Sequence, residues 1–363
     1  MSKVLTSNLT EGLIVAENIY SKAGQLIIPA NCCLTQQMIM HLSYYGISEI
    51  AINDGDIPLE AQKAMIIKKQ IQDNFKEKIE STPEYAKFHD DYLHNINVIE
   101  KYFNNIILRN TRIDEPNLIT ETVKLFDEYE STYSLFGMLH SMQKIDDSTY
   151  AHCINVSIIC RLIGTWLNFS DEDLDHLTMA GLLHDIGKCK VPEDIILKPG
   201  KLSPQEYEMV KMHTSFGYAI LQNQDVDERI KKAALLHHER FDGSGYPMGI
   251  ANDEIDLFSA IVSIADVYDA MTSNRVYRGA LCPFDVIASF EKEGLNKYHP
   301  GVILVFLEKI ANSYVNSEVL LSDGNHARII LINNRKLTRP VVQINDDFIN
   351  LEERPDSYIE AII

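Results

Sequence analysis

The chain has 363 residues, enough for two domains, and its 45% hydrophobic and 23% charged residues are ordinary for a globular protein. Its formal net charge of -19 opposes binding to a polymeric nucleic acid, whereas a small phosphate-bearing ligand needs only local positive charge. There is no apolar run of transmembrane length, no signal-peptide pattern and no CxxC pair among the six cysteines, which together predict a cytoplasmic protein without a membrane partner.

Residues 1–57 mix short β-like runs with turn signals, which predicts a small α+β module at the N-terminus. Runs at 13–16, 26–28 and 47–52 are typical of strands, and residues 35–45 have helical spacing. Residues 58–115 are expected to form a helical connector, in two helices separated by Pro83.

The second helix of this connector carries apolar residues that alternate three and four positions apart. This apolar seam consists of Tyr85, Phe88, Tyr92, Ile96, Ile99, Phe103 and Ile106. Such a narrow stripe packs either against neighbouring helices of its own chain or against a second copy. Both arrangements stay open at this point, and a homodimer is one of them.

Residues 116–318 are expected to form a helical domain, and residues 319–363 a short β extension. We expect one helix over about 116–143 and helix starts at Ser170 and Pro204. Further on, the pattern favours strands at 327–332, 340–344 and 358–363. The predicted fold is therefore mainly α, a helical bundle between an N-terminal α+β module and a C-terminal β extension.

Histidines and aspartates are concentrated in the apolar helical runs of this domain. The candidates are His152, His184, Asp185, His213, His237, His238 and Asp266. A lone histidine on a helix is usually structural, but burying adjacent polar pairs costs several kcal/mol unless each group has a partner. Metal coordination would satisfy all of them at once, and imidazole with carboxylate suits iron, manganese, zinc or cobalt.

Three segments resemble the sequence motifs of the HD-GYP family. They are HDIGK at 184–188, HHERFDGSGYP at 237–247, and the stretch from Asp266 through Arg275 to Arg278. The resemblance covers about 147–312 and implies a helical HD-type catalytic bundle. It also implies a metal-dependent phosphodiesterase that hydrolyses cyclic di-GMP to linear pGpG, in some members on to GMP. Other members act on cyclic GMP-AMP.

The resemblance also implies roles for individual residues. Asp185 would bridge two metal ions, iron or manganese, with His152, His184 and Asp266 at one ion and His213, His237 and His238 at the other. Lys188, Arg275 and Arg278 would contact substrate phosphates. The residues themselves suggest that Tyr246, in the glycine-rich loop, lines the pocket or stacks on guanine, with a structural anchor of the loop or a protein-docking surface as the alternative. Asp269, three residues after Asp266, would orient a ligand histidine or form a salt bridge on the helix surface. Some members hold a third metal through a glutamate four residues before the first histidine. Ser148 stands there in this chain, so two metals are expected.

Three other functions compete with this interpretation. A degenerate HD-GYP module would bind the nucleotide without cutting it, another HD hydrolase would act on a nucleoside monophosphate or triphosphate, and a structural helical protein would need no metal. All seven ligand positions and the complete HHExxDGxGYP motif favour the enzyme.

The glycine-rich loop at 242–249 would also suit docking of a diguanylate cyclase or another signalling protein.

Overall fold

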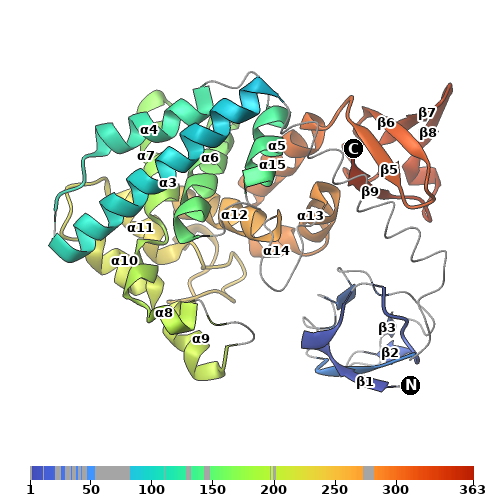
Figure 1. Ribbon diagram of the computed structural model, residues 1–363, viewed down its shortest axis with the longest axis horizontal. Helices are drawn as coiled ribbons and strands as arrows, with labels where there is room; N and C mark the ends of the chain where they lie inside the picture. Colours follow the sequence, from blue (N-terminus) through green and yellow to red (C-terminus); the bar gives the residue numbers. More distant parts are fainter. Residues whose placement is uncertain are drawn as a thin grey trace. The chain divides into compact units, whose positions relative to one another are not determined.

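The computed structural model describes residues 2–10, 12–20, 26–28, 34, 38–39, 42, 47–53, 82–109, 111–127, 132–142, 148–196, 198, 202–272 and 282–363 (Figure 1). The chain divides into two compact units. The first contains residues 1–75, 276–279 and 363, and the second contains residues 76–275 and 280–362. The mainly α fold class is confirmed, while the predicted domain boundaries at 57, 115 and 318 stay predictions.

Short antiparallel strand pairs form the first unit. Strand β1 (Ser2–Leu5) leads into a short 3-10 turn (Thr6–Asn8) and pairs with β4 (Glu49–Ile52), and β2 (Ile19–Tyr20) pairs with β3 (Leu26–Ile28). The strand predicted at 13–16 was wrong among the described residues, where Val15 makes an isolated bridge to Ile52. Most of the helix predicted at 35–45, and the one expected before Pro83, lie outside the described residues.

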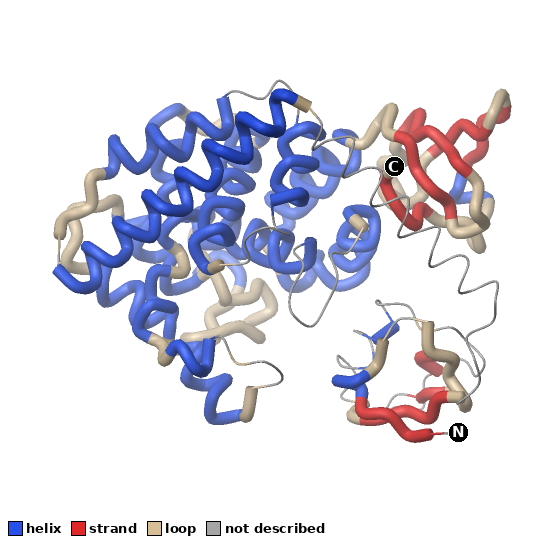
Figure 2. The backbone as a smooth tube through the Cα atoms, viewed as in Figure 1, coloured by secondary structure: helices blue, strands red, loops and turns tan. Residues whose placement is uncertain are grey.

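Most of the second unit is a helical bundle, whose helices are drawn in blue in Figure 2. Its longer helices are α3 (Pro83–Arg109), α4 (Glu115–Asp127), α5 (Thr132–Met142), α6 (Thr149–Trp166), α7 (Asp171–Leu183), α9 (Pro204–Lys211), α10 (His213–Leu221), α11 (Glu228–Leu236), α12 (Leu257–Thr272), α13 (Pro283–Ser289) and α15 (Pro300–Ser313). Short helical turns are η2 (Ile186–Lys190), α8 (Glu193–Ile196), η3 (Asn252–Glu254), η4 (Phe290–Gly294) and α14 (Leu295–Lys297). Two helices, α4 and α5, occupy the region of the single helix predicted at about 116–143, and residues 128–131 between them lie outside the described residues.

Side-chain caps explain where several of these helices begin. The hydroxyl of Ser170 accepts a hydrogen bond from the amide of Asp173 at the start of α7. Ser203 and Glu206 form a reciprocal capping box at α9, with Pro204 in the first turn. Each cap satisfies amides that a helix start leaves without partners, so the predicted starts at Ser170 and Pro204 are confirmed.

Helix α6 is the central element of the bundle. It contacts α3, α4, α7, α12 and α15, and most of its residues are buried. The hydroxyl of Tyr92 on α3 donates to Asn155 Oδ1 on α6 at 2.7 Å. Because a buried hydroxyl and amide satisfy each other here, α3 is held in one position along α6. This central helix carries His152, the first of the candidate ligands.

The apolar seam of α3 packs within the chain. Each of its seven residues is at most 7% exposed, and Phe103 meets the ring of Tyr150 edge-on at 5.7 Å between centroids. The seam is therefore not available to a second chain while α3 stays docked. The intrachain alternative is confirmed, and a homodimer formed through this seam is not supported.

Helix α10 lies unusually close to the turn η2. A Cβ atom added at Gly187 would lie 1.9 Å from the carbonyl oxygen of His213 and 2.4 Å from the amide nitrogen of Gly217. Only glycine lets two backbones approach this closely. The contact brings the start of α10 against the segment that follows α7.

The C-terminal extension is one antiparallel sheet in the strand order β8-β7-β6-β5-β9. Its strands are β5 (Glu318–Leu321), β6 (His326–Leu331), β7 (Val341–Ile344), β8 (Asp347–Asn350) and β9 (Ile359–Ile362), with a 3-10 turn at Leu351–Glu353. The three predicted strands correspond to β6, β7 and β9, and β5 and β8 were missed. Glu291 beside α13 anchors the sheet, accepting from the amide of Leu337 at 2.8 Å and the hydroxyl of Thr338 at 3.0 Å.

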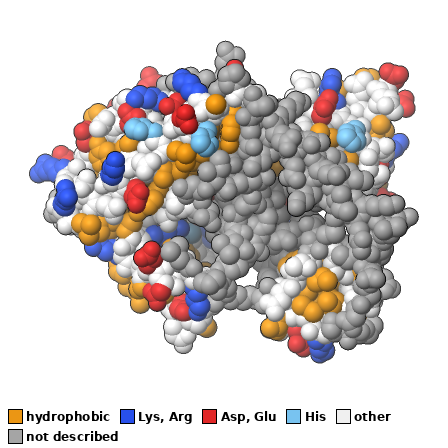
Figure 3. All heavy atoms as spheres, in the orientation of Figure 1, with side chains coloured by type: hydrophobic (Ala, Val, Ile, Leu, Met, Phe, Trp, Pro, Cys, Tyr) orange, Lys and Arg blue, Asp and Glu red, His pale blue; other side chains and the backbone are white. Residues whose placement is uncertain are grey.

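Charge is mixed over the helical part of the face that Figure 3 shows, where acidic and basic side chains alternate. Among the residues that the structure describes, no helix is both long enough and apolar enough to cross a membrane.

Truncation of the seam tests how much α3 contributes to the bundle. Phe103→Ala removes a fully buried ring and should lower the free energy of unfolding by about 3–5 kcal/mol. Leu108→Ala on the same helix is the control, because Leu108 is 79% exposed and should change stability by less than about 0.5 kcal/mol. Urea unfolding of the full chain measures both, and equal midpoints would contradict the role given to the seam.

The close approach at η2 makes a second prediction. Gly187→Ala should destabilise the chain by about 3 kcal/mol, because the methyl group would overlap backbone atoms that cannot rotate away. Gly217→Ala at the same contact is the control, since the nearest atom to its added Cβ is at 3.4 Å, an ordinary contact. Thermal unfolding should separate the two variants, and an unchanged midpoint for Gly187→Ala would refute the close-packing argument.

Candidate metal centre

Seven predicted ligands converge inside the helical unit. His152 lies on α6, His184 and Asp185 follow α7, His213 begins α10, His237 and His238 follow α11, and Asp266 lies on α12. All are buried or nearly so; the most exposed side chain, that of His238, is 20% exposed. The helical bundle therefore brings together residues that are up to 114 positions apart in the sequence.

The two oxygens of Asp185 face different histidines. Oδ2 lies 3.5 Å from Nε2 of His152 and 3.3 Å from Nε2 of His184. Oδ1 lies 3.2 Å from Nε2 of His213 and 3.8 Å from Nε2 of His237. The carboxylate thus stands between two groups of imidazoles, with one oxygen toward each group.

Each group contains enough ligand atoms for a metal ion. In one, ligand atoms of His152, His184 and Asp266 lie within 4.8 Å of one another, and in the other the same holds for His213, His237 and His238. A third set, of His184, Asp185 and His237, joins the two groups. The geometry therefore offers two adjacent sites that share Asp185.

Hydrogen bonds on the far side of each ring define the tautomers. Nδ1 of His184, His213 and His237 lies 2.7, 2.6 and 3.0 Å from the carbonyl oxygens of Gly181, Val210 and Ala233, respectively. A carbonyl oxygen only accepts, so each Nδ1 carries the proton and each Nε2 presents a lone pair. Metal-binding histidines are oriented by the same kind of contact.

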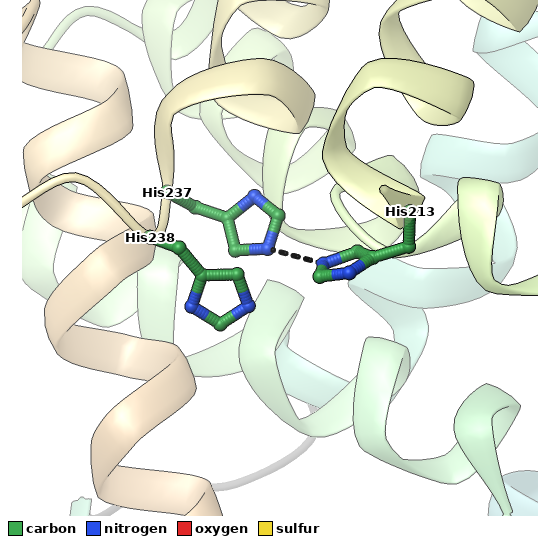
Figure 4. Close-up of side chains that lie close together, drawn as sticks. All are labelled: His213, His237 and His238. Atoms are coloured by element: carbon green, nitrogen blue, oxygen red, sulfur yellow. Dashed lines mark hydrogen bonds between the residues drawn. The ribbon is translucent and has the colours of Figure 1, made fainter. Parts of the chain in front are cut away.

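The lone pairs of His213 and His237 point at each other. Figure 4 shows the two rings facing across the site with His238 beside them, and the two Nε2 atoms are 3.2 Å apart. Two lone pairs at this distance repel unless a cation lies close to both. In addition, the buried atoms His184 Nε2 and Asp185 Oδ1 have no hydrogen-bond partner within the described residues. The residues present therefore fit divalent cations.

Electrostatics keeps most ligands in the form that binds metal. Burial alone would raise the pKa of Asp185, but the charge of Lys188, together with the adjacent ring of His184, holds this pKa well below its usual range. Burial, together with the neighbouring imidazoles, holds the pKa of His237 well below its usual value. Burial likewise lowers the pKa of His238 to about 3. An ionised carboxylate and neutral imidazoles are the ligand forms of these side chains.

His152 behaves differently because two carboxylates flank it. Burial alone would lower its pKa, but Asp266, 3.2 Å from Nε2, and Asp269, 2.7 Å from Nδ1, raise the pKa of His152 to about 9. A cation that binds at Nε2 must displace a proton there. Asp269 itself is 2% exposed, so it contacts the ring of His152 from inside the bundle, and a salt bridge on the helix surface is excluded.

Lys188 lies at the edge of the centre. Its ammonium group donates to Oδ2 of Asp185, and its side chain is 24% exposed. Burial alone would lower the pKa of Lys188, but Asp185 and Asp266 raise it, so the group stays charged. The chain leaves the α-helix for the turn η2 here, and this places Lys188 beside Asp185.

The glycine-rich loop folds back over the ligands. Buried Glu239 accepts hydrogen bonds through Oε1 from the amides of Met248 and Gly249, at 2.6 and 3.1 Å. A Cβ at Gly245 would lie 2.4 Å from the Cα atom of Glu239, so the loop requires glycine at this approach. As a result, the ring of Tyr246 stacks on that of His238, 4.6 Å away and tilted by 27°.

The structure does not test every predicted site residue, and it contains contacts that the sequence analysis did not predict. Arg275 and Arg278 lie outside the described residues, so their contacts with substrate stay predictions. Ser148 caps α6 by accepting from the amide of Ala151, which is a structural use of the position. The loop contacts of Glu239 were missed, although this glutamate stands inside the recognised motif. Tyr207 and Lys211 were also missed, and their only signal was a four-residue spacing just ahead of His213.

Comparison with known proteins shows which family and which relatives the chain is similar to. The HD domain family matches residues 116–302. A cyclic di-GMP phosphodiesterase from Thermotoga maritima is 35% identical over 189 residues, which are 51% of this chain and 51% of that protein. A cyclic di-GMP phosphodiesterase from Pseudomonas aeruginosa is 33% identical over 200 residues, 55% of this chain and 48% of that protein. A 3'3'-cGAMP-specific phosphodiesterase from Vibrio cholerae is 38% identical over 45% of this chain and 35% of that protein.

A solved structure supports the fold over a larger part of the chain. The HDG"Y"P protein Bd1817 from Bdellovibrio bacteriovorus superimposes with a TM-score of 0.50 at 16% identity, covering 85% of this chain and 98% of that one. At that identity the likeness concerns the fold alone. The chain spans about half the length, or less, of the three curated relatives compared above. The family match extends over more than half of the chain, with the buried histidine and aspartate clusters inside it, and the chain therefore belongs to the HD domain family.

Proposed function

We propose that this chain is a metal-dependent phosphodiesterase that hydrolyses cyclic di-GMP to linear pGpG. The observation that carries the proposal is the position of Asp185, which directs one carboxylate oxygen toward each of two imidazole groups. A carboxylate shared between two ligand sets can hold two divalent cations close together, as two-metal cleavage of a phosphodiester needs.

The ligand assignment follows the two groups. His152, His184 and Asp266 would hold one cation, His213, His237 and His238 would hold the other, and Asp185 would contact both. Imidazole with carboxylate suits iron or manganese, and Ser148 offers no carboxylate for a third ion. When bound, two such cations would supply an activated water molecule and neutralise negative charge on the phosphate.

The chain's own residues would orient the reaction. Lys188 brings a fixed positive charge next to Asp185, where it would stabilise negative charge on the phosphate oxygens. Tyr246, held over His238 by the glycine-rich loop, provides one wall next to the ligands. The backbone carbonyls hold the rings of His184, His213 and His237 with their lone pairs inward, and Asp269 fixes the ring of His152, so that the rings need not reorient when cations bind.

The substrate class rests on the relatives. The names of the Thermotoga maritima and Pseudomonas aeruginosa relatives specify cyclic di-GMP. Cyclic GMP-AMP is the second candidate, because the Vibrio cholerae relative that is 38% identical acts on 3'3'-cGAMP. Docking of a signalling protein on the loop at 242–249, and any homodimer, stay predictions.

Metal analysis tests the ligand assignment. Protein purified without chelator should contain two divalent cations per chain, mainly iron or manganese, because seven ligands form two groups that share Asp185. Elemental analysis alongside an assay of hydrolysis measures this. A fully active preparation with close to zero or close to three metal ions per chain would contradict the assignment.

Two substitutions separate metal binding from charge stabilisation. Asp185→Ala should reduce hydrolysis of cyclic di-GMP to background and lower the metal content, because both ligand groups lose their shared carboxylate. Lys188→Ala should retain the metal and lower kcat by about 100-fold, since it removes a charge near the phosphate but no ligand. Circular dichroism would verify that both variants remain folded. Substantial activity in a folded Asp185→Ala protein would rule out this mechanism.

A further inference from the structure

An aromatic and cationic cluster, outside the recognised motifs except for Tyr246, lies next to the metal centre. It consists of Tyr207 and Lys211 on α9 and Tyr246 on the glycine-rich loop. The ammonium nitrogen of Lys211 is 5.5 Å from the ring centroid of Tyr207 and 5.6 Å from that of Tyr246. Tyr246 in turn stacks on His238. The cluster therefore extends outward from a candidate ligand in the order His238, Tyr246, Lys211, Tyr207.

We propose that α9 binds the half of the cyclic dinucleotide that is not cleaved. Tyr207 stacks on a purine base, and Lys211 binds the second phosphate. This inference rests on the proposed phosphodiesterase function and deepens it, because it identifies residues that select a cyclic dinucleotide over a simple phosphodiester.

The exposure of Tyr207 supports the stacking role. Its side chain is 50% exposed, and none of the residues of α9 is buried. Tyr207 and Lys211 are four residues apart, so they share one face of the helix. An exposed aromatic ring beside a cation on a rigid element is the usual platform on which proteins stack nucleobases.

Both ends of α9 are held in place. At its start, the capping box of Ser203 and Glu206 is joined by Lys198, whose ammonium group lies 2.6 Å from a carboxylate oxygen of Glu206. At its end, Met212 alone separates Lys211 from His213, the candidate ligand that begins α10. The position of Tyr207 and Lys211 relative to the metal centre is therefore fixed through His213.

Charge and distance together favour the second phosphate as the partner of Lys211. A cyclic dinucleotide carries two phosphates in one ring, and only one of them can occupy the metal centre. Lys188 already stands beside Asp185, whereas Lys211 lies beyond Tyr246. The protein carries a net charge of -19, so the second phosphate also needs a local cation.

The present partner of Lys211 is easily exchanged. Lys211 pairs with Glu208 at 2.6 Å, but the side chain of Glu208 is 68% exposed. The side chain of Lys211 is 25% exposed, but a pair whose carboxylate lies mostly in water contributes little because water screens it. A phosphate group can therefore replace Glu208 without the loss of a buried contact.

Steady-state kinetics of the full-length, metal-loaded protein with cyclic di-GMP tests the inference. Tyr207→Ala and Lys211→Met should each raise KM about tenfold and change kcat by less than about twofold, because both residues act on binding and neither touches the cleaved bond. Tyr207→Phe keeps the ring and should restore a KM close to that of the unaltered protein. Met209→Ala, on the other face of the same helix and 38% exposed, is the matched control and should leave both constants unchanged.

The outcomes distinguish this inference from the proposed function. Unchanged KM in Tyr207→Ala and Lys211→Met, in a protein that cleaves cyclic di-GMP, would overturn the inference and leave the phosphodiesterase standing. An equal rise of KM in Met209→Ala would also overturn it, since it would show a general disturbance of α9. If the unaltered protein cleaves bis(p-nitrophenyl) phosphate but neither cyclic di-GMP nor cyclic GMP-AMP, the proposed function fails and this inference fails with it.

Discussion

The carboxylate of Asp185 is the group on which the arrangement of the centre depends. It is buried, it faces four imidazole nitrogens at 3.2–3.8 Å, and it pairs with Lys188. An ionised group in such a place is tolerated only when opposite charge lies close to it, and Lys188 supplies such a charge. The segments that supply the imidazoles meet around this carboxylate. Gly187, two residues further along, allows the backbone of α10 to approach closely enough for His213 to reach the carboxylate.

Orientation of the histidines is the second requirement, and the bundle meets it with its own backbone. Carbonyl oxygens of Gly181, Val210 and Ala233 accept from the outer nitrogens of three rings, and Asp269 accepts from that of His152. The inner nitrogens of the three rings held by carbonyls then present lone pairs before any cation arrives, whereas His152 must first lose the proton on its inner nitrogen. Fixing ligands in advance in this way lowers the entropy lost on binding. The fold therefore contributes to metal affinity through contacts that lie outside the ligand set.

Much of this site could be predicted from the sequence, because its chemistry is encoded in adjacent residues. His184-Asp185 and His237-His238 stand in apolar runs, where unpartnered polar groups would be costly. The starts of α7 and α9 could also be predicted from neighbouring residues, since Ser170 and Ser203 cap the helical turns that follow them. Strands β5 and β8 were missed because neither shows the period-two alternation of a half-buried strand: β5 has three consecutive buried residues and β8 has none.

The sequence by itself determined the residue types of the metal centre, the mainly helical class and the apolar face of α3. Only the tertiary structure decided what that face packs against, because periodicity defines a stripe on a helix but not its partner. The same limit applies to Asp185 and Tyr207. The local sequence does not indicate that the two oxygens of Asp185 face opposite groups of histidines. Nor does it indicate that Tyr207 and Tyr246, which are 39 positions apart, both lie near Lys211. These relations depend on how separate helices pack, and packing is a property of the whole bundle.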